Sequence, residues 1–109
     1  MTTALEILTA ARELISKPEH WTKGAYARDR LGHIVDEDDH CASCFCSAGA
    51  ILIAAGGRWD SVTSKVFLTL ADHTDKLSVP DFNDTHTHAE VLALFDAAIA
   101  AEREKAGAK

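Results

Sequence analysis

The sequence predicts a mainly α-helical single domain, residues 1–109, built from four helices with a short β-hairpin between the first two. Two observations predict this class. Apolar residues recur at three- and four-residue steps in several long segments, as they do along helices with one buried face. Proline, glycine and aspartate separate these segments, and 109 residues are enough for one modest core.

The first predicted helix spans about residues 3–16. Its apolar residues share one face: Ala4, Ile7, Leu8, Ala11, Leu14 and Ile15. Thr3 followed by Glu6 is typical of a capping box, and Pro18 is expected to end the helix.

A short β-hairpin is predicted within residues 19–39. Its strand formers are Tyr26, Ile34 and Val35. Asp29–Gly32 has the composition of a tight turn. Because two strands alone are marginally stable in water, the hairpin is expected to lean on the helices through Trp21 and Tyr26. The acidic run Asp36–Asp39 is expected to be a solvated loop.

The second predicted helix is the apolar segment Cys46–Ala55, which is ended by Gly56–Gly57. It is expected to lie at the centre of the core, surrounded by the apolar faces of the other helices. Gly49 within it indicates that a neighbouring helix crosses at close range. The third predicted helix spans about residues 60–72, with Asp60 as its N-cap.

The last predicted helix begins near Thr87, because Thr87 and Glu90 form a second capping-box signature. Asp84 is an alternative N-cap for the same helix. The segment around Pro80, which precedes it, is expected to be a turn. The tail, residues 103–109, is expected to fray.

Charge and composition exclude several kinds of partner. The formal net charge is −6 and the eleven basic residues are spread thinly, which disfavours binding to a nucleic-acid backbone. The longest apolar run, Ala48–Ala55, is too short to span a membrane. Three cysteines exclude a complete disulfide framework, and the first six residues lack the features of a secretory signal. A reducing, cytoplasmic setting is therefore expected.

One alternative function is a zinc site. Six residues are of the right kinds: His40, Cys41, Cys44, Cys46, His86 and His88. Cys41 and Cys44 have the spacing of a zinc knuckle, but no glycine turn lies between them and no second such pair follows. If the segment is helical, Cys46 points about 140° away from Cys41. No metal is therefore expected. The candidate ligands of the zinc alternative are Cys41, Cys44, His86 and His88.

A second alternative is a thiol-dependent enzyme. Cys46 would be the nucleophile at a helix N-terminus, where the helix dipole lowers the pKa of a thiol. His86 or His88 would be the base. Asn83 or Asp84 would orient that base. The apolar neighbours of Cys46 favour packing in the core instead, so that no catalytic residue is expected.

Two segments are candidates for a binding surface. Trp21–Asp29 combines aromatic, small and charged residues outside a helix, and Asn83–Asp84 lies at a predicted helix start. The candidate ligand-binding residues are Trp21, Tyr26, Arg28, Asp29, Asn83 and Asp84. The same residues could instead serve only to anchor the hairpin and to cap the last helix.

Four blocks occur in an order and spacing that are typical of a known family. They are residues 21–32, which begin Trp-Thr-Lys-Gly-Ala-Tyr-Ala-Arg-Asp, then Cys46–Ala50, Phe82–Asp84 and residues 87–99. Over nearly its full length the chain resembles a family of uncharacterised small proteins, a domain of unknown function found in bacteria and their phages. The resemblance implies no particular activity.

The resemblance does bear on the cysteines and on the class of function. In that family the position of Cys46 is usually cysteine, whereas Cys41 and Cys44 are peculiar to this chain, which counts against zinc. The phage association implies a small binder that blocks or sequesters a host component. The sequence therefore favours a small, acidic, non-enzymatic binding or interaction module with a protein or small-molecule partner. The alternative is a thiol-dependent enzyme or a zinc-binding module.

Overall fold

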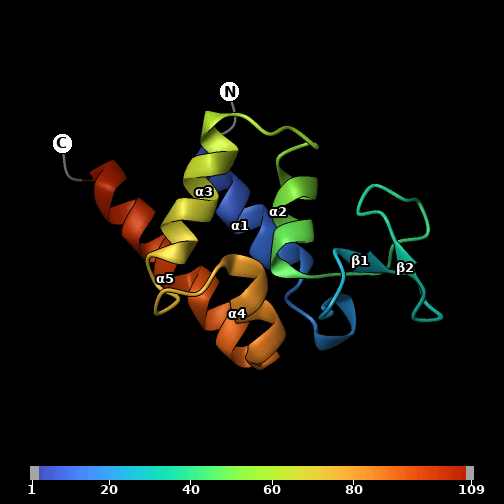
Figure 1. Cartoon of the computed structure of the whole chain (residues 1–109). Coiled ribbons are helices and arrows are strands. Elements are labelled where there is room, and N and C mark those ends of the chain that lie inside the picture. The colour runs from blue at the N-terminus through green and yellow to red at the C-terminus, as the bar shows by residue number, and fades with distance from the viewer. Residues whose placement is uncertain (1–2, 108–109) are drawn as a thin grey trace.

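The computed structural model describes residues 3–107 and places within them five α-helices and a three-stranded sheet (Figure 1). In chain order the elements are α1 (Ala4–Leu14), the 3-10 helix η1 (Pro18–His20), β1 (Ala27–Arg28), β2 (Ile34–Val35), β3 (Cys44–Phe45), α2 (Ser47–Ala54), α3 (Ser61–Ala71), α4 (Val79–Thr85) and α5 (His88–Gly107). The mainly helical class is therefore confirmed. The predicted count of four helices is wrong, because α4 is a fifth.

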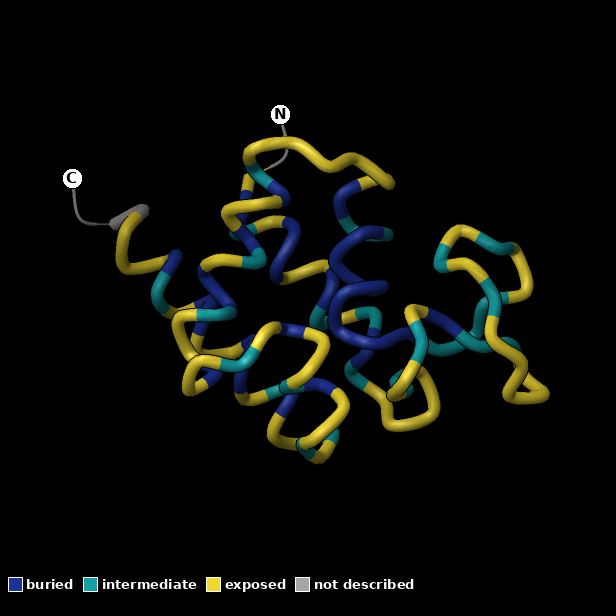
Figure 2. The backbone as a smooth tube through the Cα atoms, in the orientation of Figure 1, coloured by how far each residue is buried: buried dark blue, intermediate teal, exposed yellow. Residues whose placement is uncertain are grey.

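The core lies between α1, α2, α3 and α5, whose buried faces meet in the middle of the molecule (Figure 2). Its largest fully buried apolar side chains are Leu8, Ile15, Ile51, Val66, Leu70, Val91 and Phe95. The short helix α2 contacts α1, α3 and α4, as expected of a segment packed among helices. The last helix, which the sequence also predicts around this segment, packs mainly against α1 instead. Within residues 3–107, no helix combines the length and the apolar character needed to cross a membrane.

The predicted N-caps of α1 and α3 are present. At α1, the Thr3 hydroxyl accepts a hydrogen bond from the backbone N of Glu6, and the Glu6 carboxylate accepts one from the backbone N of Thr3. At α3, the Asp60 carboxylate accepts from the backbone N of Thr63 at 3.0 Å. Pro18 does not end α1, which stops at Leu14; it begins η1 instead, where its missing N–H is tolerated.

Helix α4 occupies the segment around Pro80, where the sequence predicts a turn. Pro80 lies in the first helical turn, where its fixed φ suits a helix and its missing N–H leaves no partner unsatisfied. The Ser78 hydroxyl caps this helix by accepting from the backbone N of Asp81 at 3.2 Å. The prediction of a turn around Pro80 is wrong. Proline breaks a helix when it lies in the interior, but it is well tolerated in the first turn.

Helix α5 is capped by Thr87 and not by Asp84, which lies inside α4. The Thr87 hydroxyl accepts from the backbone N of Glu90 at 3.2 Å, and the Glu90 carboxylate accepts from the backbone N of Thr87 at 2.9 Å. The alternative N-cap at Asp84 is therefore wrong. The helix continues to Gly107, into the tail for which the sequence predicts fraying.

The three short strands form a sheet in the order β2-β1-β3, with both pairings antiparallel. The β1–β2 hairpin is confirmed, and Asp29–Gly32 forms its turn. The strand β3 shows that residues 41–46 are not helical, because Cys44 and Phe45 pair with β1. The chain enters α2 only after Cys46, the N-cap residue of that helix.

Gly49 lies at a close approach, as predicted, but its neighbour is not a helix. A Cβ atom at Gly49 would be 2.2 Å from the carbonyl oxygen of Tyr26, next to β1. The same carbonyl accepts a hydrogen bond from the backbone N of Cys46 at 3.1 Å. The sheet is therefore held directly against the first turn of α2.

Candidate functional site

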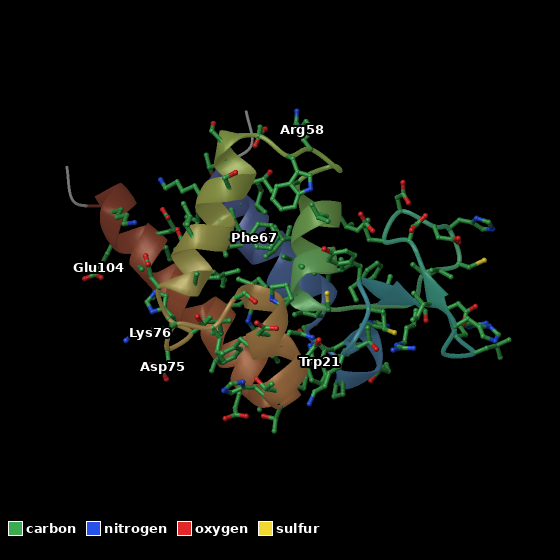
Figure 3. The ribbon with its side chains drawn as sticks, viewed as in Figure 1. Trp21, Arg58, Phe67, Asp75, Lys76 and Glu104 are labelled. Atoms are coloured by element: carbon green, nitrogen blue, oxygen red, sulfur yellow. The ribbon has the colours of Figure 1, made fainter. Side chains whose placement is uncertain are left out.

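The buried side chain of Asn83 joins three parts of the chain that are far apart in sequence. Its Oδ1 accepts hydrogen bonds from the indole Nε1 of Trp21 at 2.7 Å and from the backbone N and hydroxyl of Ser47 at 3.0 and 2.8 Å. Its Nδ2 donates to the carbonyl of Thr22 at 3.0 Å. In Figure 3 the labelled Trp21, which belongs to the segment that leads from η1 to β1, lies accordingly beside α4. Asn83 therefore fastens α4 and the start of α2 to that segment.

Asp84, the next residue on α4, adds an exposed carboxylate beside this buried network. Its Oδ1 accepts hydrogen bonds from the backbone N of Gly24 at 2.9 Å and from the Nδ2 of Asn83 at 3.3 Å. Gly24 has a φ of +77°, in the left-handed region that favours glycine, and this conformation turns its N–H toward the carboxylate. The other carboxylate oxygen, Oδ2, has no hydrogen-bond partner among residues 3–107.

Arg28 and Asp29 hold the hairpin together. The Arg28 guanidinium donates to the hydroxyl of Thr22 and to the carbonyls of Lys23 and Gly32, at 3.0–3.2 Å. The Asp29 carboxylate accepts from two backbone N–H groups of the turn, and these hydrogen bonds keep its pKa below the usual value for aspartate. Both side chains therefore have a structural role, which is one of the two alternatives that the sequence leaves open.

An open hollow of about 380 Å³ lies between the hairpin, the start of α2 and α4. It is lined by Gly24, Ala25, Tyr26, Ile34, Cys46, Pro80 and Asp84. Two of the six candidate binding residues, Tyr26 and Asp84, are in its wall. The sequence does not point to Ile34 and Pro80 as lining residues, because only the packing of the hairpin beside α4 places them at one site.

The hairpin also carries three large apolar side chains in contact with solvent, which we call the hairpin surface: Tyr26 (51% exposed), Leu31 (81%) and Ile34 (67%). In Figure 1 the hairpin extends away from the helical part of the molecule. In Figure 2 most of this extension is coloured as exposed or intermediate. Since large apolar side chains gain free energy when they leave water, this group is a candidate contact surface.

Cys46 does not have the environment of a nucleophile. Its side chain is buried, and its sulfur accepts a hydrogen bond from the backbone N of Gly49 at 3.3 Å. Burial raises the pKa of the Cys46 thiol, and the nearby charge of Asp84 acts in the same direction. A thiol with a raised pKa forms little thiolate at neutral pH, which is the opposite of what nucleophilic catalysis requires.

The two histidines proposed as bases have other partners. His86 stacks on the ring of Phe82 with 3.7 Å between ring centroids, and its Nδ1 lies 3.0 Å from the Phe82 carbonyl. The Nε2 of His88 lies 2.7 Å from the carbonyl of Ile15. Asn83 is fully engaged by the buried network. Within residues 3–107, no hydrogen bond therefore joins His86 or His88 to the Cys46 thiol.

The burial of Cys46 predicts that it reacts slowly with thiol reagents. In native buffer, Cys41, which is exposed, should be alkylated at least about tenfold faster than Cys46. Mass spectrometry of peptides after timed alkylation measures the two rates, with unfolded protein as the control in which all three cysteines react alike. If Cys46 were the fastest of the three, the assignment of this thiol to the core would be wrong.

The candidate zinc ligands are not gathered at one place. Among the described residues, the one group whose potential ligand atoms lie within 4.8 Å of one another is Asp39, His40 and Cys41, in an exposed loop. Cys44 instead contacts the carbonyl of Arg28 through its sulfur. His86 and His88 lie near α4 and α5, where their ring nitrogens face the carbonyls of Phe82 and Ile15. The structure therefore assembles no tetrahedral set from Cys41, Cys44 and these histidines within residues 3–107.

The fold and the site together define a small, mainly helical domain with an extended β-hairpin and an open hollow beside it. The chain belongs to the protein family described as Family of unknown function (DUF6197), which matches residues 1–101. The membership confirms the resemblance to a family without an assigned activity. No curated protein and no solved structure matches this chain.

Proposed function

We propose that this protein is a non-enzymatic interaction module that binds a partner polypeptide through the hairpin surface. The observation that carries the proposal is the exposure of Tyr26, Leu31 and Ile34 on one short hairpin. Interaction sites commonly concentrate their binding energy in a few large side chains of this kind. The thiol and zinc alternatives have weaker support, because their candidate residues are buried or dispersed.

The way in which the hairpin is anchored supports the same proposal. The segment Trp21–Gly24 that leads into β1 is held by Asn83 and Asp84, and β1 is paired on both sides by strands. A contact surface on a firmly held element loses little conformational entropy when it binds. The hairpin is therefore suited to present its side chains in one arrangement.

The outer edge of β2 favours a polypeptide over a small molecule as the partner. The backbone N of Asp29 donates to the carbonyl of His33 at 2.9 Å, so these two residues form a hydrogen-bonded pair of the antiparallel ladder. Such pairs alternate, and the N–H and C=O of Ile34 in the next pair therefore point away from β1. In the part of the chain that the structure describes, β2 has no strand on that side. An extended peptide can add to an edge of this kind.

Selection from a random-peptide display library, with the whole protein as bait, tests this function. Peptides that bind are then measured against Ile34→Ser and Tyr26→Ser. We expect losses of about tenfold or more, because each change removes a large apolar contact worth about 1.5–3 kcal/mol when buried.

Leu68→Ser is the matched control. Leu68 is as exposed as Ile34, at 67%, but it lies on α3, which α2 separates from the hairpin in Figure 1. Binding by this variant should equal that of the original protein. Failure to select any peptide, or equal losses in the Leu68 and Ile34 variants, would contradict the proposal.

A further inference from the structure

We propose that the hollow beside the hairpin accepts a lysine or arginine side chain of the partner polypeptide, with the Asp84 carboxylate as its counter-ion. This inference rests on the proposed function and adds the chemistry that the partner presents. It depends on the shape of the hollow, on the one carboxylate in its lining and on the net charge of the chain.

The shape and lining suit a long side chain with a charged end. The hollow has a volume of about 380 Å³ and is open to solvent, so a side chain can enter without displacing the backbone. The apolar part of its lining comes from Pro80, Tyr26 and Ile34. Lysine and arginine bury the methylene part of their side chains against such surfaces while the charged end reaches a polar group.

Asp84 is the ionisable carboxylate in this lining, and it has capacity for a further partner. Its Oδ1 is held by Gly24 and Asn83, which fixes the orientation of the carboxylate, while Oδ2 is left for a ligand. None of the ion pairs within residues 3–107 includes Asp84. A carboxylate that is oriented in advance can form a charge-assisted hydrogen bond with an ammonium or guanidinium group.

The lysine next to Gly24 in the chain, Lys23, does not pair with the Asp84 carboxylate among the described residues. Lys23 precedes Gly24, but its ammonium group lies over the ring of Trp21, 5.5 Å from the ring centroid. This position allows a cation–π contact and turns the charge toward Trp21. An outside cation is therefore the better candidate for the Asp84 carboxylate.

The net charge of the whole chain favours a basic partner. The Arg28 guanidinium lies beside Gly24, but it is engaged by Thr22, Lys23 and Gly32. The acidic run Asp36–Asp39 follows β2 in the sequence. The whole chain has a formal net charge of −6. Such a field attracts a basic segment and repels an acidic one during the encounter.

Titrations followed by NMR spectroscopy test the inference on the isotope-labelled whole protein. The probes are the Nα-acetyl N-methylamides of lysine, arginine and norleucine, the last of which has the apolar stem without the charge. We expect the lysine and arginine probes to shift the amide signals of Gly24, Ala25 and Asp84, with dissociation constants on the order of millimolar. Norleucine should bind at least about fivefold more weakly.

Asp84→Asn is the test variant and Asp81→Asn the matched control. Both remove one negative charge from an exposed position of α4, but only Asp84 lines the hollow. The asparagine oxygen can still accept the hydrogen bond from Gly24, so the variant should fold. We expect Asp84→Asn to weaken binding of the lysine probe about fivefold or more, and Asp81→Asn to leave it nearly unchanged.

Three results would overturn the inference. They are equal binding of norleucine and lysine, equal effects of the two aspartate variants, or signal shifts confined to the loop Asp36–Asp39. Failure of this inference is distinguishable from failure of the proposed function. If Ile34→Ser abolishes binding of selected peptides while Asp84→Asn does not, the hairpin surface is retained as the binding site and the cation site is rejected.

Discussion

Replacing Asn83 by alanine is expected to destabilise the protein by about 3–5 kcal/mol. The side chain of Asn83 is fully buried, and its loss leaves the Trp21 indole, the backbone N and hydroxyl of Ser47, and the Thr22 carbonyl without their partner. A buried polar group without a partner costs about 1–3 kcal/mol. Chemical denaturation monitored by circular dichroism measures the change in the free energy of unfolding.

Two further variants separate the role of Asn83 from that of its neighbour. Asn83→Asp keeps an acceptor for Trp21 and Ser47 but replaces the donor to Thr22 by a carboxylate beside Asp84. It should therefore be unstable at neutral pH and partly recover in acid, where a protonated carboxyl can donate. Asp84→Ala removes the two hydrogen bonds that its carboxylate accepts, from the backbone N of Gly24 and from the Nδ2 of Asn83, and should cost about 1–2 kcal/mol, less than Asn83→Ala. Equal stability of the Asn83→Ala variant and the original protein would contradict the buried network.

Gly49→Ala is expected to destabilise the protein by about 2 kcal/mol or more, although alanine is the better helix former. The added Cβ would lie 2.2 Å from the Tyr26 carbonyl oxygen, which is a backbone atom and cannot rotate away. Either β1 or the first turn of α2 would have to move, and the hydrogen bond from Cys46 to Tyr26 would lengthen. Gly49→Leu should be more severe and should unfold or greatly loosen the domain.

The sign of the change in stability on Gly49→Ala distinguishes between the two effects of the added methyl group. Helix propensity alone would stabilise α2 by about 1 kcal/mol, so only the close approach of Tyr26 can make the substitution destabilising. Ala54→Gly at the last residue of the same helix is the control, and it should cost no more than about 1 kcal/mol. Thermal melting compares the three proteins, and a raised melting temperature for Gly49→Ala would show that the contact is wrong.

The helices α1, α3 and α5 could be predicted from the sequence because their signals are local. Each cap joins residues three positions apart, as Thr87 and Glu90 do, and each apolar face repeats within one or two turns. The hairpin is likewise marked by Asp29–Gly32 at its turn. Helix α4 escaped prediction because it is seven residues long and starts around Pro80, where local signals indicate a turn as readily as a helix.

The candidate site could be predicted only in part. The sequence points to six candidate residues in two segments, and the structure brings four of them to one region, namely Trp21, Tyr26, Asn83 and Asp84. Their ligand-binding role stays a prediction. The sequence alone could not show that the side chain of Asn83 is buried whereas the carboxylate of its neighbour Asp84 is exposed. The burial of each side chain depends on which distant residues pack against it.

The sequence by itself therefore determined the long helices, their caps and the hairpin, since hydrogen bonds and apolar spacing over three or four residues encode them. Only the tertiary structure decided that Cys44 joins a sheet and that Ile34 and Pro80 face one hollow. The same holds for the hydrogen bond between Trp21 and Asn83, which are 62 positions apart. Such contacts are selected by the packing of the whole core, because many residues of the same types could satisfy the local pattern equally well.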